Sequence, residues 1–184
     1  MNTDAEVPLT FRPPSSSAAK AVSPFRKPAV EFLKGSWHVT HSTLPMWKKN
    51  KNVVITYTLL ESPSGGIDDL VQYKPLNSDK QKTVEGIDKP DPDVEAAYNW
   101  RGKGWLKIAS SHWEVLGYGE EDEGWVVTFF AKTLFTPAGI DIYARRQGGL
   151  SEDLIQRIRA EMRKIDDPGF QKQADEIFEI KHEW

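Results

Sequence analysis

Four polar side chains of this chain could do chemistry, and they lie in segments with the residue pattern of β-strands. They are one imidazole, two phenols and one carboxylate: His41, Tyr57, Tyr143 and Asp141. Such groups can orient a ligand by hydrogen bonding or polarise its carbonyl group. Polar groups inside a fold are also often satisfied by water or by one another. We keep both interpretations and take His41, Tyr57 and Asp141 as the candidate catalytic residues.

The composition excludes several other kinds of site. The 184 residues include no Cys, which rules out disulfides, thiolate metal ligands, iron–sulfur clusters and a cysteine nucleophile. No pair of His residues has metal-ligand spacing supported by a third ligand, so we expect no metal site. The sequence has neither a glycine-rich phosphate loop nor a Gly-x-Ser-x-Gly motif. Any catalysis would depend on shape and hydrogen bonding, without a cofactor.

Charge and hydropathy narrow the possible partners and location. The 24 basic and 27 acidic residues give a formal net charge of -3, which argues against nucleic-acid binding. No apolar run reaches the roughly 18 residues of a membrane-spanning helix, so we expect no stable membrane insertion. A secretory signal pattern is missing, and Asp4 and Glu6 disfavour a mitochondrial presequence. These features predict a cytoplasmic, single-domain protein that is a monomer or a weak homo-oligomer.

The chain divides into a tail and a strand-rich domain. Residues 1–27 contain four prolines and a run of three serines without apolar periodicity, which predicts a disordered tail. Residues 28–184 form the folded domain. Its β-branched and aromatic runs predict strands over residues 53–60, 70–73, 82–87, 96–100, 105–109, 113–118, 125–135 and 140–144. Eight or nine strands with short turns are typical of an antiparallel sandwich or a closed up-and-down barrel.

One amphipathic helix is predicted over residues 151–165. Ser151 is a candidate N-cap, and two acids follow it in the first turn, where the helix dipole favours them. Five residues at helical spacing form an apolar face: Leu154, Ile155, Ile158, Met162 and Ile165. Pro168 is expected to end the helix, and residues 177–180 predict a last short strand.

The order of three motifs resembles the lipocalin family, and more closely its bacterial-type intracellular or periplasmic members. Gly35-Ser36-Trp37 matches the first family motif, and Pro45 matches a proline of the first large loop. Arg145 closes the last strand and is followed by Leu150-Ser151 and the helix. The middle motif, Thr-Asp-Tyr, is replaced by Asp122-Glu123-Gly124-Trp125. The resemblance covers the chain from about Phe32 to its C-terminus.

The resemblance implies an all-β fold, an eight-stranded antiparallel up-and-down barrel with the amphipathic helix packed outside. One end of such a barrel is closed and the other is open. In lipocalins the tryptophan of the first motif closes the floor, and the arginine stacks over it. The matching pair is Trp37 and Arg145, and a cation–π contact of this kind contributes about 0.5–2 kcal/mol.

Strand alternation then assigns an inward face, once Trp37 is placed inside. His41, Tyr57, Asp141 and Tyr143 are expected to point inward, and Ile140 and Ile142 outward beneath the helix. The phase of the middle strands is open, with Ile108 and Lys132 as further candidates. The expected ligand contacts are Val39, Trp47, Ile55, Leu59, Tyr98, Trp100, Trp113, Phe130 and Tyr143. The acids at Asp68-Asp69 and residues 120–123 are interpreted as solvated turn and edge positions.

The loop over residues 44–51 would lie over the open end. Met46 and Trp47 could form an apolar lid there, or Trp47 could pack on the rim of a solvated basic loop. Its three lysines could attract an anionic ligand group or a membrane surface.

Two functions follow from the resemblance. One is a cofactor-free cyclase, a pericyclase of the Diels–Alder type found among lipocalin-like proteins of natural-product pathways. It would act on a polyene, terpenoid or polyketide intermediate by orienting its reacting ends. The other is a non-catalytic intracellular carrier of a small hydrophobic molecule such as a fatty acid, terpenoid, polyketide or tetrapyrrole. An interaction protein is a third, weaker interpretation.

Overall fold

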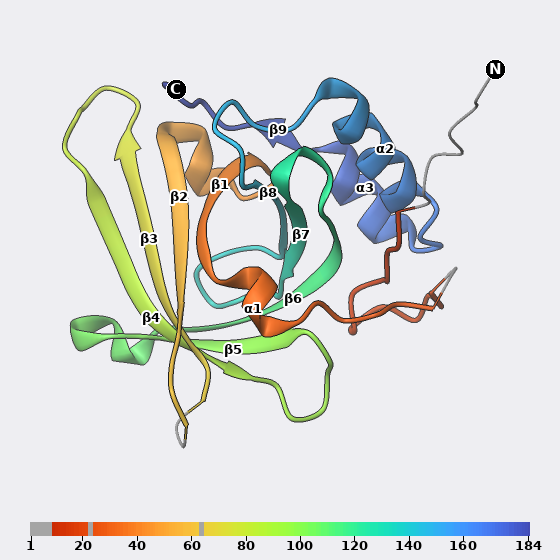
Figure 1. The fold of residues 1–184 in the computed structure, drawn as a ribbon, viewed down its shortest axis with the longest axis horizontal. Coiled ribbons are helices and arrows are strands. Elements are labelled where there is room, and N and C mark those ends of the chain that lie inside the picture. Colours follow the sequence, from red (N-terminus) through yellow and green to blue (C-terminus); the bar gives the residue numbers. More distant parts are fainter. Residues whose placement is uncertain (1–8, 22–23, 63–64) are drawn as a thin grey trace.

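Eight antiparallel strands close into a barrel in the computed structural model, which describes residues 9–21, 24–62 and 65–184 (Figure 1). Each strand pairs with the next along the chain, and β1 closes the ring by pairing with both β8 and β2. The up-and-down barrel implied by the motifs is therefore confirmed. The strands are β1 (Gly35–Ser42), β2 (Asn50–Leu59), β3 (Ile67–Pro75), β4 (Lys82–Pro90), β5 (Ala97–Gly102), β6 (Ser110–Gly119), β7 (Trp125–Phe130) and β8 (Gly139–Ala144).

The two ends of the barrel differ. At the closed end the short helix α1 (Val30–Leu33) leads into β1, and the 3₁₀ turn η3 (Glu121–Glu123) joins β6 to β7. At the open end lie the 3₁₀ helices η1 (Pro45–Lys49) and η2 (Gly104–Ile108). The open-end connections are residues 43–49, 76–81, 103–109 and 131–138, and the closed-end connections are residues 60–66, 91–96 and 120–124.

Two predicted strand boundaries are wrong at the open end. The strand predicted over residues 105–109 is replaced by η2 (Gly104–Ile108), because the chain turns at Gly104, whose φ of 58° lies in the left-handed region that favours glycine. β7 ends at Phe130 instead of continuing to residue 135. Thr133 begins a turn there, since its hydroxyl accepts hydrogen bonds from the backbone of Phe135 and Thr136.

A bulge in β1 changes which side chains face the barrel interior. Val39 lies opposite Tyr143 on β8, whereas His41 lies opposite Ile142, so Thr40 is an extra residue. A bulge of this kind reverses the alternation for the rest of the strand. His41 therefore faces outward, and the prediction that it points into the barrel is wrong.

Two helices cover the outer face of β6, β7 and β8 (Figure 1). α2 (Glu152–Arg163) has Ser151 as its N-cap, as predicted. Pro168 does not end the helical region but begins α3 (Pro168–Asp175), because Asp167 caps that helix through Phe170 N at 2.9 Å and proline suits the first helical turn. β9 (Phe178–Glu179) then pairs with β1. None of the helices in the described part of the chain is long and apolar enough to cross a bilayer.

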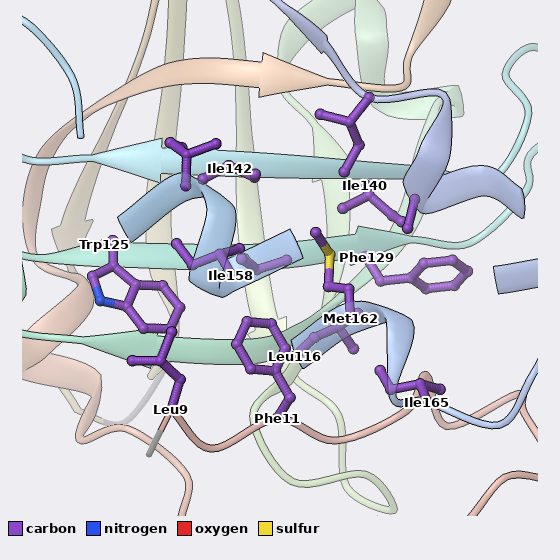
Figure 2. Packing of buried hydrophobic residues seen from close by; sticks show 14 of the residues in the cluster. Leu9, Phe11, Leu116, Trp125, Phe129, Ile140, Ile142, Ile158, Met162 and Ile165 are labelled. Atoms are coloured by element: carbon purple, nitrogen blue, oxygen red, sulfur yellow. The ribbon is translucent and has the colours of Figure 1, made fainter. Parts of the chain in front are cut away.

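A hydrophobic core lies between these helices and the barrel wall. Figure 2 shows Ile158 and Met162 of α2 close to Ile140 and Ile142 of β8, which therefore lie beneath the helix as predicted. All four side chains are fully buried. Burial of each contributes roughly 1.5–3 kcal/mol, so this layer holds the helices on the barrel.

The N-terminal segment extends the same core. Phe11 is buried and its ring stacks on Trp125 with the ring centres 5.8 Å apart (Figure 2). The next residue, Arg12, forms an ion pair with the buried Glu114 at 3.0 Å. The prediction of a disordered tail is therefore wrong where these anchors hold the chain. The parts of that predicted tail that lie outside the described residues are 1–8 and 22–23.

Candidate ligand-binding site

The closed end is sealed by Trp37. Its indole is fully buried and donates a hydrogen bond to the carbonyl of Leu33 at 2.8 Å. The guanidinium carbon of Arg145 lies 3.6 Å from the ring centre, and Arg145 also donates to the carbonyl of Ser36 at 3.0 Å. The predicted cation–π pair is confirmed, and it serves to close the barrel.

Three aromatic rings stack inside the barrel. Trp113 lies between Tyr57, at 5.7 Å between ring centres, and Tyr98, at 4.6 Å. The indole N–H of Trp113 donates to Oδ1 of Asp88 at 2.8 Å. Burial raises the pKa of Tyr57 well above its usual value and that of Tyr98 to about 12. Both phenols therefore stay protonated and can donate hydrogen bonds.

Two carboxyl groups that the sequence analysis missed lie together in this interior. Asp69 on β3 is 6% exposed and Asp88 on β4 is 0% exposed. Burial raises the pKa of Asp88 to about 7, and burial with the charge of Asp88 raises the pKa of Asp69 well above its usual value. Burial therefore favours the protonated form of Asp69. The interpretation of Asp69 as a solvated turn residue is wrong, and alternation from the buried Ile67 two residues earlier would have placed it inside.

A second polar group surrounds Asp141 on β8. The hydroxyl of Ser42 donates to Oδ1 of Asp141 at 2.5 Å, and burial raises the pKa of this carboxyl to about 7. Tyr143 follows on the same face of the strand. Burial, with the charge of Asp141, raises the pKa of the Tyr143 phenol well above its usual value. This part of the interior therefore offers protonated oxygens at neutral pH.

Five buried polar atoms inside the barrel form no well-aligned hydrogen bond with the described residues: Trp47 Nε1, Asp69 Oδ1, Asp88 Oδ2, Thr128 Oγ1 and Tyr143 OH. Their polar neighbours lie close by, since Trp47 lies near Asp141, Asp69 near Asp88, and Tyr143 near Thr128 and Tyr57. A buried polar atom left unpaired costs about 1–3 kcal/mol. The set contains both donors and acceptors, so a polar group that enters the interior can bind to several of them.

Trp47 lies inside the barrel mouth and not over it as an exposed lid. It is 6% exposed, and its ring meets Tyr73 edge-on with the ring centres 5.4 Å apart. Met46, the other residue of the expected lid, stays exposed. Lys51 does not share the exposed, basic character expected for this loop, because its side chain is buried and forms an ion pair with Glu183 at 3.0 Å.

His41 does not join the interior polar groups. It lies on the outer face of β1, and its Nδ1 is 3.0 Å from the hydroxyl of Thr40. Burial, with the charge of Arg159 on α2, lowers the pKa of His41 to about 4. Of the three candidate catalytic residues, the structure brings only Tyr57 and Asp141 into the barrel.

The candidate ligand contacts occupy one region. All nine belong to a single cluster inside the barrel, in which Leu59, Trp100 and Phe130 are partly exposed and the others are buried. Their contact with a ligand stays a prediction.

A hollow of about 1250 Å³ lies between η2, the β7–β8 connection and the outer face of β4 to β6, where Lys89, Asn99 and Arg101 line it. Trp100, Ile108 and Lys132, all candidates from the sequence, contribute to its wall. The wall carries five cationic side chains and no acidic one. These cations are Lys89, Arg101, Lys103, Lys107 and Lys132.

Comparison with known proteins identifies the fold. No protein-family model and no curated protein sequence matches this chain. Solved structures do match: insecticyanin from the tobacco hornworm Manduca sexta has 12% sequence identity and a TM-score of 0.65, with 89% of this chain and 85% of that chain covered. The cockroach allergen Per a 4 has 10% identity and a TM-score of 0.64, with 90% and 95% covered. The siderocalin Ex-FABP, described as functioning through dual ligand specificities, has 14% identity and a TM-score of 0.55, with 83% and 95% covered. The chain therefore has the lipocalin fold that its motifs imply.

Proposed function

We propose that this protein binds one small, mainly apolar molecule that carries a polar group and enters the barrel from its open end. The observation that carries the proposal is the set of five buried polar atoms that lack a well-aligned hydrogen bond in an aromatic interior. Eight-stranded barrels of this type are wide enough to hold one small ligand among their side chains. A ligand that meets these atoms would recover part of the free energy that their burial costs.

The chemistry of the interior indicates the class of ligand. Stacked rings of Tyr57, Trp113 and Tyr98 offer flat apolar surfaces. The indole N–H of Trp47 and the hydroxyl of Tyr143 lack a well-aligned acceptor and could donate to a carbonyl or hydroxyl oxygen of a ligand. Fatty acids, terpenoids, polyketides and tetrapyrroles combine such an apolar body with oxygen acceptors.

Ligand titration tests the proposal. Quenching of tryptophan fluorescence and native mass spectrometry would be measured with palmitate, farnesol, an anthraquinone polyketide and protoporphyrin. At least one probe should bind with one-to-one stoichiometry, and Tyr143→Phe should weaken that binding about 5- to 30-fold, as expected for one lost hydrogen bond. Tyr118→Phe, near the closed end, is the matched control and should bind as the wild type does. No one-to-one binding, or equal loss in both variants, would contradict the proposal.

A cofactor-free cyclase is a second function that one observation favours. Tyr57, Tyr143 and Asp141 place hydrogen-bond donors inside the same aromatic interior, where a bound polyene could be held with its reacting ends together. Cyclisation of a polyene probe would be followed by chromatography. Turnover that is lost in Tyr57→Phe and Asp141→Asn but kept in His41→Gln would support catalysis. Binding without turnover of any probe would leave the carrier function.

A further inference from the structure

Large apolar side chains are exposed mainly at the open end of the barrel. Eight such side chains are exposed in the described part of the chain, and six of them lie on the open-end connections. The four most exposed flank the hollow on two loops: Trp105 (87%), Ile108 (89%), Leu134 (97%) and Phe135 (84%). The other two are Met46 and Leu76. Each open-end connection therefore presents apolar surface to solvent, and we call this surface the apolar rim.

Charged residues are also distributed unequally between the two ends of the barrel, with lysines concentrated at the open end. The three strand-to-strand connections at the closed end contain eight acids and no lysine or arginine, while Lys34, Arg145 and Arg146 flank the barrel at this end. The open-end connections contain one acid, Asp79, which lies 3.6 Å from Lys51. They also contain six lysines: Lys48, Lys49, Lys80, Lys103, Lys107 and Lys132. A chain with a net charge of -3 thus has one strongly cationic end.

The cations stand beside the apolar side chains. Lys107 precedes Ile108, and Lys132 lies two residues before Leu134. Lys107 and Lys132 form no ion pair with any residue that the structure describes, whereas Lys103 pairs with Asp68 at 2.6 Å. Apolar tips flanked by free lysines match the two layers of a bilayer surface, which has acyl chains below anionic phosphates.

We infer that the open end of the barrel docks on an anionic lipid membrane surface. The apolar rim enters the interface between headgroups and acyl chains, and the lysines contact lipid phosphates. The acidic closed end is repelled by the same surface, so the charge division turns the open end toward the membrane before contact. This docking is independent of the ligand proposed for the interior, and it would place the barrel mouth where apolar molecules are dissolved.

Vesicle flotation with the full chain tests this inference. Wild-type protein should bind vesicles of equimolar phosphatidylcholine and phosphatidylglycerol at least about tenfold more tightly than vesicles of phosphatidylcholine alone, and salt should weaken the binding. Trp105→Ser with Phe135→Ser should reduce binding to the anionic vesicles about tenfold or more. Lys107→Glu with Lys132→Glu should do the same. These four side chains are exposed or at the rim, and circular dichroism would verify that both variants fold.

Matched changes at the closed end provide the control. Val30→Ser removes an exposed apolar side chain there, and Lys34→Glu reverses an exposed charge. Both should bind anionic vesicles as the wild type does. Equal binding to neutral and anionic vesicles would overturn the inference. So would self-association, measured by analytical ultracentrifugation, that depends on Trp105 and Phe135 in a protein that binds no vesicle, because the rim would then be an interface between copies of this chain.

Discussion

Burial decides the protonation of the carboxyl groups inside the barrel. Asp141 has a folded-state pKa of about 7, while an Asp in an unfolded chain titrates near 4. Between these two values the folded state binds more protons than the unfolded state. The free energy of unfolding therefore falls as the pH rises from about 4 to about 7.

Asp141→Asn should remove this contribution, because the amide does not titrate and can still accept the hydrogen bond from Ser42. Each pKa unit corresponds to about 1.4 kcal/mol, so the variant should become relatively more stable by up to about 4 kcal/mol between pH 4 and pH 7. Urea denaturation at both pH values measures the difference. Asp93→Asn, in an exposed turn, is the control and should follow the wild type. A parallel pH dependence in the wild type and Asp141→Asn would contradict the burial argument.

At the residue scale, sequence reasoning could place side chains only where alternation is unbroken. Tyr57, Asp141 and Tyr143 lie where the alternation puts them. His41 does not, because one extra residue in β1 turns it outward, and a bulge has no residue signature here. Asp69 also follows the alternation of β3 from Ile67, although a charged side chain beside Asp68 is more typical of a solvated turn.

At the element scale, the seal at the closed end depends on the planar guanidinium group of Arg145. The Arg145 guanidinium stacks on Trp37 and donates to backbone carbonyls at the same time. Lysine carries the charge but has neither the plane nor the spread of donors. Arg145→Lys should therefore lower the free energy of unfolding by about 1–2 kcal/mol in urea denaturation. Arg163→Lys, in an exposed pair with Asp175, should change it by less than about 0.5 kcal/mol, and equal effects would refute the stacking role.

Elements were predictable where side-chain pattern and turn residues agree. The strands around Val53–Leu60 and Ile140–Ala144 combine β-branched runs with flanking Gly or Pro, and both are strands in the structure. η2 escaped prediction because Trp105 and Ile108 look like strand residues, although both side chains are exposed to solvent. α3 escaped because Pro168 is compatible both with a helix end and with a helix start.

At the scale of the whole molecule, the N-terminal segment joins the helical layer to the barrel. Phe11 lies against Gly117, where no larger side chain would leave room for its ring. Phe11→Ala should lower the free energy of unfolding by about 2–4 kcal/mol, because it empties part of the outer core. Leu134→Ala, which truncates an exposed side chain, should have little effect. Urea denaturation compares them, and an unaffected Phe11→Ala would show that the segment is not held in solution.

Composition could not reveal this anchoring. Prolines and serines dominate the segment, and a few contacts far apart in sequence, such as that of Arg12 with Glu114, hold it in place. Barrel closure was predictable only through the motif resemblance, because no strand pattern states which strand pairs with the first. The difference in charge between the two ends can be seen in the sequence only after each connection has been assigned to the open or the closed end.

The bulge at Thr40 moves the inward-facing positions of β1 by one residue. Before the bulge, Trp37 and Val39 face the barrel interior, and after it Ser42 does. Deletion of Thr40 would remove the bulge without turning its neighbours, because Val39 and Ser42 already face inward and His41 already faces outward. The His41 ring should then keep its lowered pKa, which NMR would measure. The added residue lets Val39 and Ser42, three positions apart, face the same interior.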